Sequence, residues 1–421
     1  MLLAGLLFSC SVSKRIGREL EKEEASREDL RGFVVFDPAS DKELINYNGN
    51  KYFIPASTVK LFTFYTAYMT LPDSVPSIEY LEKGDSLFIR GTADPLVLEE
   101  DEDPVVRFLE NRKEKVFLID RSIDDDVYGP GWSWEDFTQE FMPERSMLPL
   151  YGNRVSISRV GDSLEIVPDL FAGDVEDLED GSVSMRKANK ARDPFRNHFY
   201  IQSLAEGQER QVPFVTSNQL AADLLSQAID RKVTLYAELE NEIFTKLRTR
   251  PYDSLYTRML IDSDNFIAEQ LMLQVGYETD SVYRVKTGID HAMTELLDEI
   301  PQRPKWVDGS GLSRYNLFTP ESVVFLLKKL YQEIPSEKLM GYLAVGGVSG
   351  TLKDNYAAAD GKPFVFAKSG TLSNNYCLSG FLRTRRGKIL LFSFMDNHYL
   401  GSSGDRKREI NSILERLRES Y

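Results

Sequence analysis

Apolar positions recur with two different periods along the chain, and each period predicts a type of element. Residues 60–69 are apolar around most of a helical circumference, which is typical of a helix buried at the centre of a domain. Residues 410, 413, 414 and 417 follow the i, i+3, i+4, i+7 pattern of an amphipathic helix packed on a sheet. Short runs rich in β-branched and aromatic residues predict strands at 32–37, 86–90, 115–119, 363–367, 376–383 and 388–395. We therefore expect a mixed α/β (α+β) protein.

The pattern changes near residue 73 and changes back near residue 213. Between these points turn residues and acidic runs are frequent, and the predicted strands are short. We interpret 73–212 as a strand-rich inserted region. The segments 13–72 and 213–421 then form one large α/β domain, which begins with a charged helix at 13–29.

Charge and metal-ligand content exclude several classes of function. The chain has 421 residues, with 51 basic and 66 acidic side chains, so its formal net charge is −15. An acidic surface repels phosphate backbones, which argues against a nucleic acid partner. The three histidines do not cluster, and no C-x-x-C or H-E-x-x-H spacing occurs. We expect no metal site, and a hydrolase built on this sequence would use a base other than histidine.

The N-terminus resembles an export signal. Residues 1–8 are apolar or small, and they lead into Leu7-Phe8-Ser9-Cys10. This segment is too short to span a bilayer, but it is similar to the lipobox of bacterial lipoproteins. We expect residues 1–12 to act as the signal, with Cys10 as a lipid anchor, and the mature chain to lie in the periplasm or cell envelope.

A serine and a lysine at helical spacing form the first candidate for chemistry. Ser57 and Lys60 are three residues apart, directly before the apolar helix, so they share one helix face. A lysine activates a serine hydroxyl only when its pKa falls, and burial or a second cation lowers it. Ser-x-x-Lys also occurs at Ser11 and at Ser184, but no apolar helix follows those copies.

Two further segments offer groups that such a site would need. Ser263 and Asn265 carry a hydroxyl and an amide at two-residue spacing, although Ser-Asp-Asn is also a common helix cap. Lys368-Ser369-Gly370 lies at the end of a predicted strand, where the lysine supplies a second cation. A similar triplet, 286–288, lacks a preceding strand, and Ser-x-Asn recurs at 373–375.

The three segments in this order resemble the S-x-x-K, S-x-N and K-[ST]-G motifs of serine penicillin-recognising enzymes. The long spacing between the first two motifs resembles that in class C low-molecular-mass penicillin-binding proteins, the D-alanyl-D-alanine carboxypeptidase/endopeptidase family. Local matches to that family occur at Gly91–Leu96, Gly129–Trp134, Ser263–Glu269, Asp308–Asn316 and Gly350–Leu352. Trp132 and Trp134 are interpreted as packing residues.

The resemblance implies a penicillin-binding/β-lactamase-like transpeptidase domain, with an antiparallel sheet flanked by helices. It implies that Ser57, Lys60, Ser263, Asn265 and Lys368 are catalytic and that Ser369, Gly370 and Thr371 bind substrate, without metal or organic cofactor. The implied substrates are peptidoglycan stem peptides ending in D-Ala-D-Ala, and the implied inhibitors are β-lactams. A noncatalytic penicillin sensor or peptidoglycan-binding protein of the same fold is the alternative.

Overall fold

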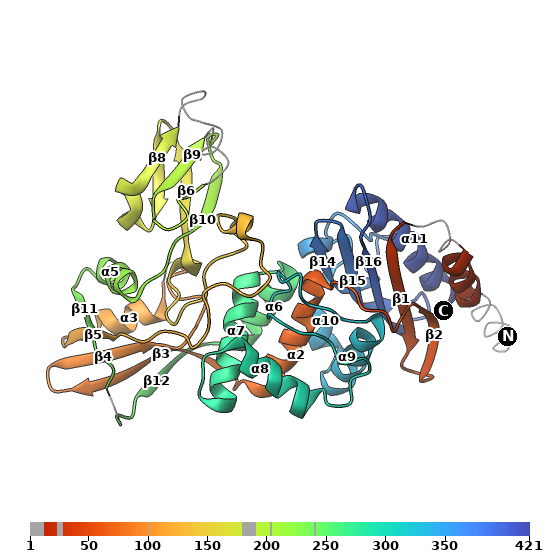
Figure 1. Cartoon of the computed structure of the whole chain (residues 1–421), viewed down its shortest axis with the longest axis horizontal. Helices are drawn as coiled ribbons and strands as arrows, with labels where there is room; N and C mark the ends of the chain where they lie inside the picture. Colours follow the sequence, from red (N-terminus) through yellow and green to blue (C-terminus); the bar gives the residue numbers. More distant parts are fainter. Residues whose placement is uncertain (1–11, 23–27, 101, 179–190, 203, 240) are drawn as a thin grey trace.

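A six-stranded antiparallel sheet forms the centre of one half of the protein (Figure 1). The computed structural model describes residues 12–22, 28–100, 102–178, 191–202, 204–239 and 241–421, so Cys10 and the serines of the two further Ser-x-x-Lys copies lie outside it. The sheet order is β13-β14-β15-β16-β1-β2. Its strands are β1 (Leu30–Asp37), β2 (Lys42–Tyr47), β13 (Ala344–Val345), β14 (Val365–Leu372), β15 (Asn375–Arg383) and β16 (Ile389–Asn397).

Helices cover both faces of this sheet, which explains why its strands are apolar on both sides. Phe33 and Val35 of β1 pack in a core with a helix at 12–22 and with α11, whereas Val34 and Phe36 pack against the opposite helical layer. The helices are α2 (Lys60–Thr70), α6 (Tyr252–Ile261), α7 (Asn265–Asp280), α8 (Val285–His291), α9 (Pro320–Glu333), α10 (Ser336–Gly341) and α11 (Ser403–Ser420). The expected mixed fold, with helices flanking an antiparallel sheet, is confirmed.

The other half contains three smaller sheets, at the left of Figure 1. A five-stranded sheet has the order β11-β5-β4-β3-β12, a three-stranded sheet has the order β10-β6-β7, and β8 pairs with β9. Helices α3 and α5 share a hydrophobic core with the five-stranded sheet. The elements are β3 (Ser74–Lys83), β4 (Ser86–Gly91), α3 (Pro104–Glu110), β5 (Lys115–Ile119), β6 (Arg154–Val160), β7 (Ser163–Val167), β8 (Val175–Leu178), β9 (Phe199–Gln202), β10 (Glu209–Pro213), α5 (Asn218–Ala228), β11 (Val233–Tyr236) and β12 (Thr245–Pro251).

The pairing of β11 and β12 bears on the boundary of the inserted region. Both strands follow residue 212, yet β11 pairs with β5 and β12 pairs with β3 inside the five-stranded sheet. Helix α6 begins directly after β12, at Tyr252. We therefore propose that the inserted region runs from 73 to 251, beyond the expected boundary at 212.

The strand that carries the third motif differs from its predicted bounds. The expected strand at 363–367 begins at Val365 and continues through Leu372, so Lys368-Ser369-Gly370 lies inside the strand rather than at its end. All eight residues of β14 pair with β15 without a bulge, and Gly370 lies opposite Cys377. This continuous pairing extends β14 past the lysine and fixes the direction of each side chain of the motif.

Candidate active site

The expected nucleophile and the expected base lie next to each other where two helical segments join. Ser57 belongs to the 3₁₀ helix η1 (Ala56–Val59), and Lys60 is the first residue of α2. The Lys60 side chain is 0% exposed, and its Nζ lies 3.0 Å from the Oγ of Ser57. Ser57 itself is only half-buried. The structure thus brings the serine and the lysine of the first motif into hydrogen-bond contact.

The backbone before Ser57 adopts an unusual conformation that its neighbours enforce. Ala56 has a φ of +48°, in the left-handed region that residues with a side chain rarely adopt. Gly311 lies so close that a Cβ atom on it would be 2.0 Å from the carbonyl oxygen of Ala56. A Cβ atom on Gly370 would be 2.7 Å from the carbonyl oxygen of Pro55. Strained backbone of this kind persists only where surrounding structure holds it, and it clusters at functional sites.

The second motif begins helix α7. The Oδ1 of Asp264 caps the helix by accepting a hydrogen bond from the backbone N–H of Ile267, at 3.0 Å. Asn265, the first helical residue, accepts a hydrogen bond from Lys60 Nζ on its Oδ1, at 2.5 Å, and donates from Nδ2 to the carbonyl of Phe141, at 2.9 Å. The motif therefore supplies both the helix cap and a contact to the buried lysine.

Ser263 directly precedes this cap. Its φ is +66°, its side chain is half-buried, and within the described part of the chain no group forms a hydrogen bond with its hydroxyl. A serine whose backbone adopts the left-handed conformation directly before a helix turns the chain sharply. The role of Ser263 as a proton relay stays a prediction.

The third motif presents four successive residues of β14. Lys368 is fully buried, and its Nζ donates to the carbonyl of Ser369 at 2.9 Å. The hydroxyl of Ser369 donates to Thr351 Oγ1 at 2.8 Å, which ties the strand to η6 (Gly350–Leu352). Gly370 is buried against η1, and Thr371 is exposed.

Burial and neighbouring charges set the pKa values of the two lysines. Burial lowers the pKa of Lys60 to about 8, while the carboxylates of Asp308, Asp264 and Glu269 act in the opposite direction. Burial also lowers the pKa of Lys368 well below its usual value, and the charge of Lys60 is the second cause. A neutral amine beside a serine hydroxyl is therefore accessible at ordinary pH, as nucleophilic activation requires.

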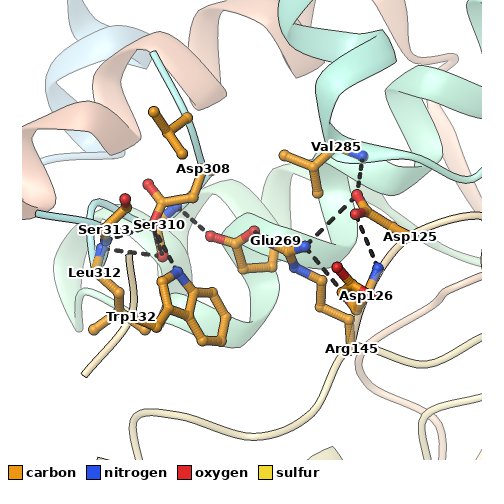
Figure 2. A network of polar contacts seen from close by, with 12 residues as sticks. Asp125, Asp126, Trp132, Arg145, Glu269, Val285, Asp308, Ser310, Leu312 and Ser313 are labelled. Atoms are coloured by element: carbon orange, nitrogen blue, oxygen red, sulfur yellow. Dashed lines mark hydrogen bonds and ion pairs between the residues drawn. The ribbon is translucent and has the colours of Figure 1, made fainter. Parts of the chain in front are cut away.

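The loop from Asp308 to Asn316 folds around the carboxylate of its first residue. Asp308 accepts hydrogen bonds from Gly311 N at 2.9 Å, Ser313 N at 2.6 Å and Asn316 Nδ2 at 2.6 Å. Its Oδ2 also accepts a hydrogen bond from the indole nitrogen of Trp132, at 2.9 Å, as Figure 2 shows. This loop delivers the carbonyl of Ser310 to Lys60 Nζ, at 2.7 Å.

Two buried charged residues, Arg145 and Glu269, pair behind this loop. Arg145 comes from the inserted region and pairs with Glu269 of α7, at 2.7 Å. The family resemblance included Glu269 in a matching segment, but it did not predict which residue Glu269 contacts. Nothing in the sequence pointed to Arg145. Trp132 packs against Arg145, with the guanidinium carbon 5.1 Å from the centre of the indole ring, in agreement with the expected packing role. Trp134 is instead 58% exposed, contrary to a purely packing role.

The competing triplet at 286–288 lies on a helix and not on the central sheet. Lys286 of the 286–288 triplet lies on α8, is exposed and pairs with Asp290.

Within the described ranges no three His, Cys, Asp or Glu side chains gather closely enough to hold a metal ion. Of the helices in the part of the chain that the structure describes, none has the length and apolar character needed to cross a bilayer.

Solved structures share this architecture. Penicillin-binding protein 4 (DacB) from Haemophilus influenzae superimposes with a TM-score of 0.71 at 20% identity, over 93% of this chain and 95% of that one. The same protein complexed with a β-lactam gives 0.70. A predatory peptidoglycan endopeptidase from Bdellovibrio bacteriovorus matches with a TM-score of 0.54 at 14% identity, over 93% of each chain.

Sequence comparisons extend the likeness. D-alanyl-D-alanine carboxypeptidase DacB of Haemophilus influenzae is 25% identical over 89% of this chain and 86% of its own length. A D-alanyl-D-alanine carboxypeptidase of Actinomadura sp. is 24% identical over 88% of this chain and 78% of its own length. The model of the D-Ala-D-Ala carboxypeptidase 3 (S13) family matches residues 12–198 and 200–420. This chain, with its serine and lysine in contact beside strand β14 of the central sheet, therefore belongs to the D-Ala-D-Ala carboxypeptidase 3 (S13) family.

Proposed function

We propose that this protein is a penicillin-sensitive serine D-Ala-D-Ala carboxypeptidase that acts on peptidoglycan stem peptides through an acyl-enzyme on Ser57. The observation that carries the proposal is the position of Lys60 Nζ, 3.0 Å from Ser57 Oγ and fully buried. The family match supplies the reaction class. The residue roles below are our assignments.

The first step transfers the peptide to the enzyme. The neutral amine of Lys60 takes the proton of the Ser57 hydroxyl while Oγ bonds to the carbonyl carbon of the penultimate D-alanine. The C–N bond to the terminal D-alanine then breaks, and the departing amine receives a proton from the Lys60 ammonium through the Ser263 hydroxyl. The products are an ester on Ser57 and free D-alanine.

The surrounding groups orient the substrate and stabilise developing charge. Backbone N–H groups of Ser57 and Thr371 form the oxyanion hole in this proposal, a contribution usually worth about 3 kcal/mol. Lys368 and Ser369 bind the terminal carboxylate, and Asn265 holds the peptide amide. The close fit of β14 against η1 at Gly370 supports this arrangement, because it brings the two N–H donors toward the same space.

Hydrolysis of the ester completes the cycle. Water gives a proton to Lys60 and its oxygen bonds to the acyl carbon; the bond from that carbon to Ser57 Oγ then breaks, and Lys60 returns the proton to Oγ, which releases the shortened peptide and restores the hydroxyl. A β-lactam mimics the acyl-D-alanyl-D-alanine group, but its leaving group stays tethered to the acyl carbon. We therefore expect a long-lived penicilloyl ester on Ser57.

The cell envelope is the compartment that fits a peptidoglycan substrate. The lipobox-like segment ending at Cys10 supports export and a lipid anchor. Metabolic labelling with a radioactive fatty acid tests the anchor, because label on the wild-type chain and none on Cys10→Ser is the expected result.

The decisive experiment combines trapping with product analysis. A fluorescent penicillin is expected to label the wild-type chain and the Ser373→Ala control, but not Ser57→Ala. Mass spectrometry of a synthetic stem pentapeptide, and of a cross-linked peptide dimer, then identifies the bond that is cut. Release of D-alanine from the pentapeptide is the expected result.

Other outcomes separate the alternatives. A labelled protein that cuts neither substrate would be a penicillin sensor, and cleavage of the dimer alone would make it an endopeptidase. Labelling of Ser57→Ala at the wild-type rate would contradict the assignment of the nucleophile.

A further inference from the structure

The three contacts of Lys60 are sufficient to aim its lone pair. Its Nζ lies near Ser57 Oγ at 3.0 Å, Asn265 Oδ1 at 2.5 Å and Ser310 O at 2.7 Å. A neutral amine has two N–H donors and one lone pair. Because Asn265 Oδ1 and the Ser310 carbonyl can only accept, they take the two N–H groups, and the lone pair then points at the Ser57 hydroxyl. The Ser310 carbonyl is thus one of two groups that orient the base.

The peptide of Ser310 is held from behind by a buried carboxylate. Glu269 Oε1 accepts a hydrogen bond from the backbone N–H of Ser310 at 2.7 Å. Glu269 is 1% exposed and lies one turn after Asn265 on α7. The same helix therefore supplies the amide that accepts directly from Lys60 and the carboxylate that fixes the other acceptor.

The carboxylate depends in turn on an arginine from the inserted region. Arg145 is 1% exposed, and its Nη2 lies 2.7 Å from Glu269 Oε2. Burial raises the pKa of Glu269, and the guanidinium of Arg145 opposes that rise. Arg145 rests on the ring of Trp132 and extends toward Asp125, whose Oδ2 is 3.6 Å from Nη1 (Figure 2). A buried carboxylate without this partner would be strongly driven to take up a proton.

We propose that Glu269 and Arg145 are positioning residues for Lys60, acting through the Ser310 peptide. The inference rests on the proposed function, since it assumes that Lys60 is the base. It adds that the inserted region takes part in the reaction by holding Glu269 ionised and in place. Neither residue touches the substrate or Ser57 in this assignment.

Other charges also face Lys60 and have to be counted. Asp264 is the cap of α7, Glu269 lies on α7, Asp308 lies in the loop, and Lys368 lies on β14. Replacing Glu269 by glutamine removes one negative charge and leaves the other three groups unchanged. The pKa of Lys60 then falls, so the neutral amine forms at lower pH. A role limited to folding would not move the pH dependence.

The test is the second-order rate constant for acylation by a fluorescent penicillin, measured from pH 6 to pH 10. For Glu269→Gln we expect the rising limb of the profile to move to lower pH. We also expect the plateau to fall about 10- to 100-fold, because the Ser310 carbonyl loses its fixed place. Glu144→Gln is the matched control, since Glu144 is a buried glutamate of the inserted region that binds Thr216 instead. It should keep the wild-type profile.

Arg145 variants test the second link of the chain of contacts. Arg145→Gln should reproduce both effects, and Arg145→Lys should restore part of the plateau. The Arg145→Gln/Glu269→Gln double variant should lose no more than the slower single variant, since both act on one peptide. Should Arg145→Gln fail to fold, the Glu269→Gln profile alone decides.

Failure of the inference and failure of the proposed function give different results. If penicillin acylates the wild-type protein, and Glu269→Gln shows the same acylation rate and the same pH profile, the inference is overturned but the proposed function stands. An additive double variant would also overturn it. Absence of acylation in wild type would overturn the proposed function and the inference with it.

Discussion

Gly370 of β14 lies against the backbone nitrogen of Ser57, so close that a Cβ atom on this glycine would be 2.8 Å from that nitrogen. The same atom would lie 2.7 Å from the carbonyl oxygen of Pro55. Both neighbours are backbone atoms, which cannot rotate away. The strand and the nucleophile are therefore fixed relative to each other by direct contact of two main chains.

Gly370→Ala is expected to damage both activity and stability. The added methyl group must push η1 away from β14, which costs about 1–3 kcal/mol and displaces the proposed oxyanion donors. Acylation by penicillin should slow at least 10-fold, a rough figure for a displacement near 1 Å. Gly341→Ala is the control, because nothing lies within 4 Å of the Cβ position there. Equal acylation rates in the two variants would contradict the argument.

The acylation rate of the wild-type protein is expected to follow the neutral form of Lys60. Because the pKa of Lys60 is lowered to about 8, the neutral fraction grows about tenfold per pH unit below that value and levels off above it. Lys60→Arg keeps the positive charge at every accessible pH, and we expect its acylation to be undetectable. A wild-type rate that is flat between pH 6 and pH 9 would rule out Lys60 as the base.

Lys368→Met should weaken recognition of the substrate carboxylate. An arriving carboxylate favours the charged form of Lys368, and a hydrogen bond to a charged group contributes about 1.5–3 kcal/mol. We expect kcat/KM for a peptide with a free C-terminus to fall about 10- to 100-fold. The same peptide with a C-terminal amide should lose much less. Equal losses on the two peptides would indicate a role other than carboxylate binding.

Asp308→Asn is expected to destabilise the fold. Asp308 accepts from three backbone or side-chain N–H groups of its own loop and from the Trp132 indole, and an amide cannot satisfy this set of donors. We expect the free energy of unfolding in urea to fall by about 2–4 kcal/mol. The exposed Asp298→Asn should change it by less than about 0.5 kcal/mol.

The thiol of Cys377 should be unreactive in the folded protein. Cys377 is buried opposite Gly370, and burial raises its pKa above the usual value, so little thiolate is present. In a Cys10→Ser background, where Cys377 is the single cysteine of the sequence, a thiol reagent should react only after denaturant is added. Rapid reaction in native buffer would show that β14 and β15 separate readily.

Local pattern was enough to predict several elements of the fold. The apolar run after Ser57 is the buried helix α2, and the stripe that includes Ile410 and Leu414 packs α11 on the sheet. These elements are set by the burial of their own side chains. The proposed end of the inserted region rests on pairing that local pattern does not reveal, because β11 and β12 pair with the distant strands β5 and β3.

The candidate site divides in the same way. The motif residues Ser57, Lys60 and Asn265 do meet, and their identity could be read from spacing and order. Arg145 could not be found, because its partner Glu269 lies 124 positions away and a single arginine among many carries no local signal. Its importance comes from burial and charge pairing, which exist only in the folded chain.

The contribution of Trp132 and Arg145 has a consequence for how this protein can be taken apart. Both side chains come from the inserted region: Trp132 donates to Asp308 in the 308–316 loop, and Arg145 pairs with Glu269 of α7. Excision of residues 73–251, even with the flanking ends rejoined, would strip the loop of its indole donor and leave a buried glutamate uncompensated. The inserted region is thus an integral part of the fold around the site, and any replacement for it must keep a tryptophan and an arginine at these two places.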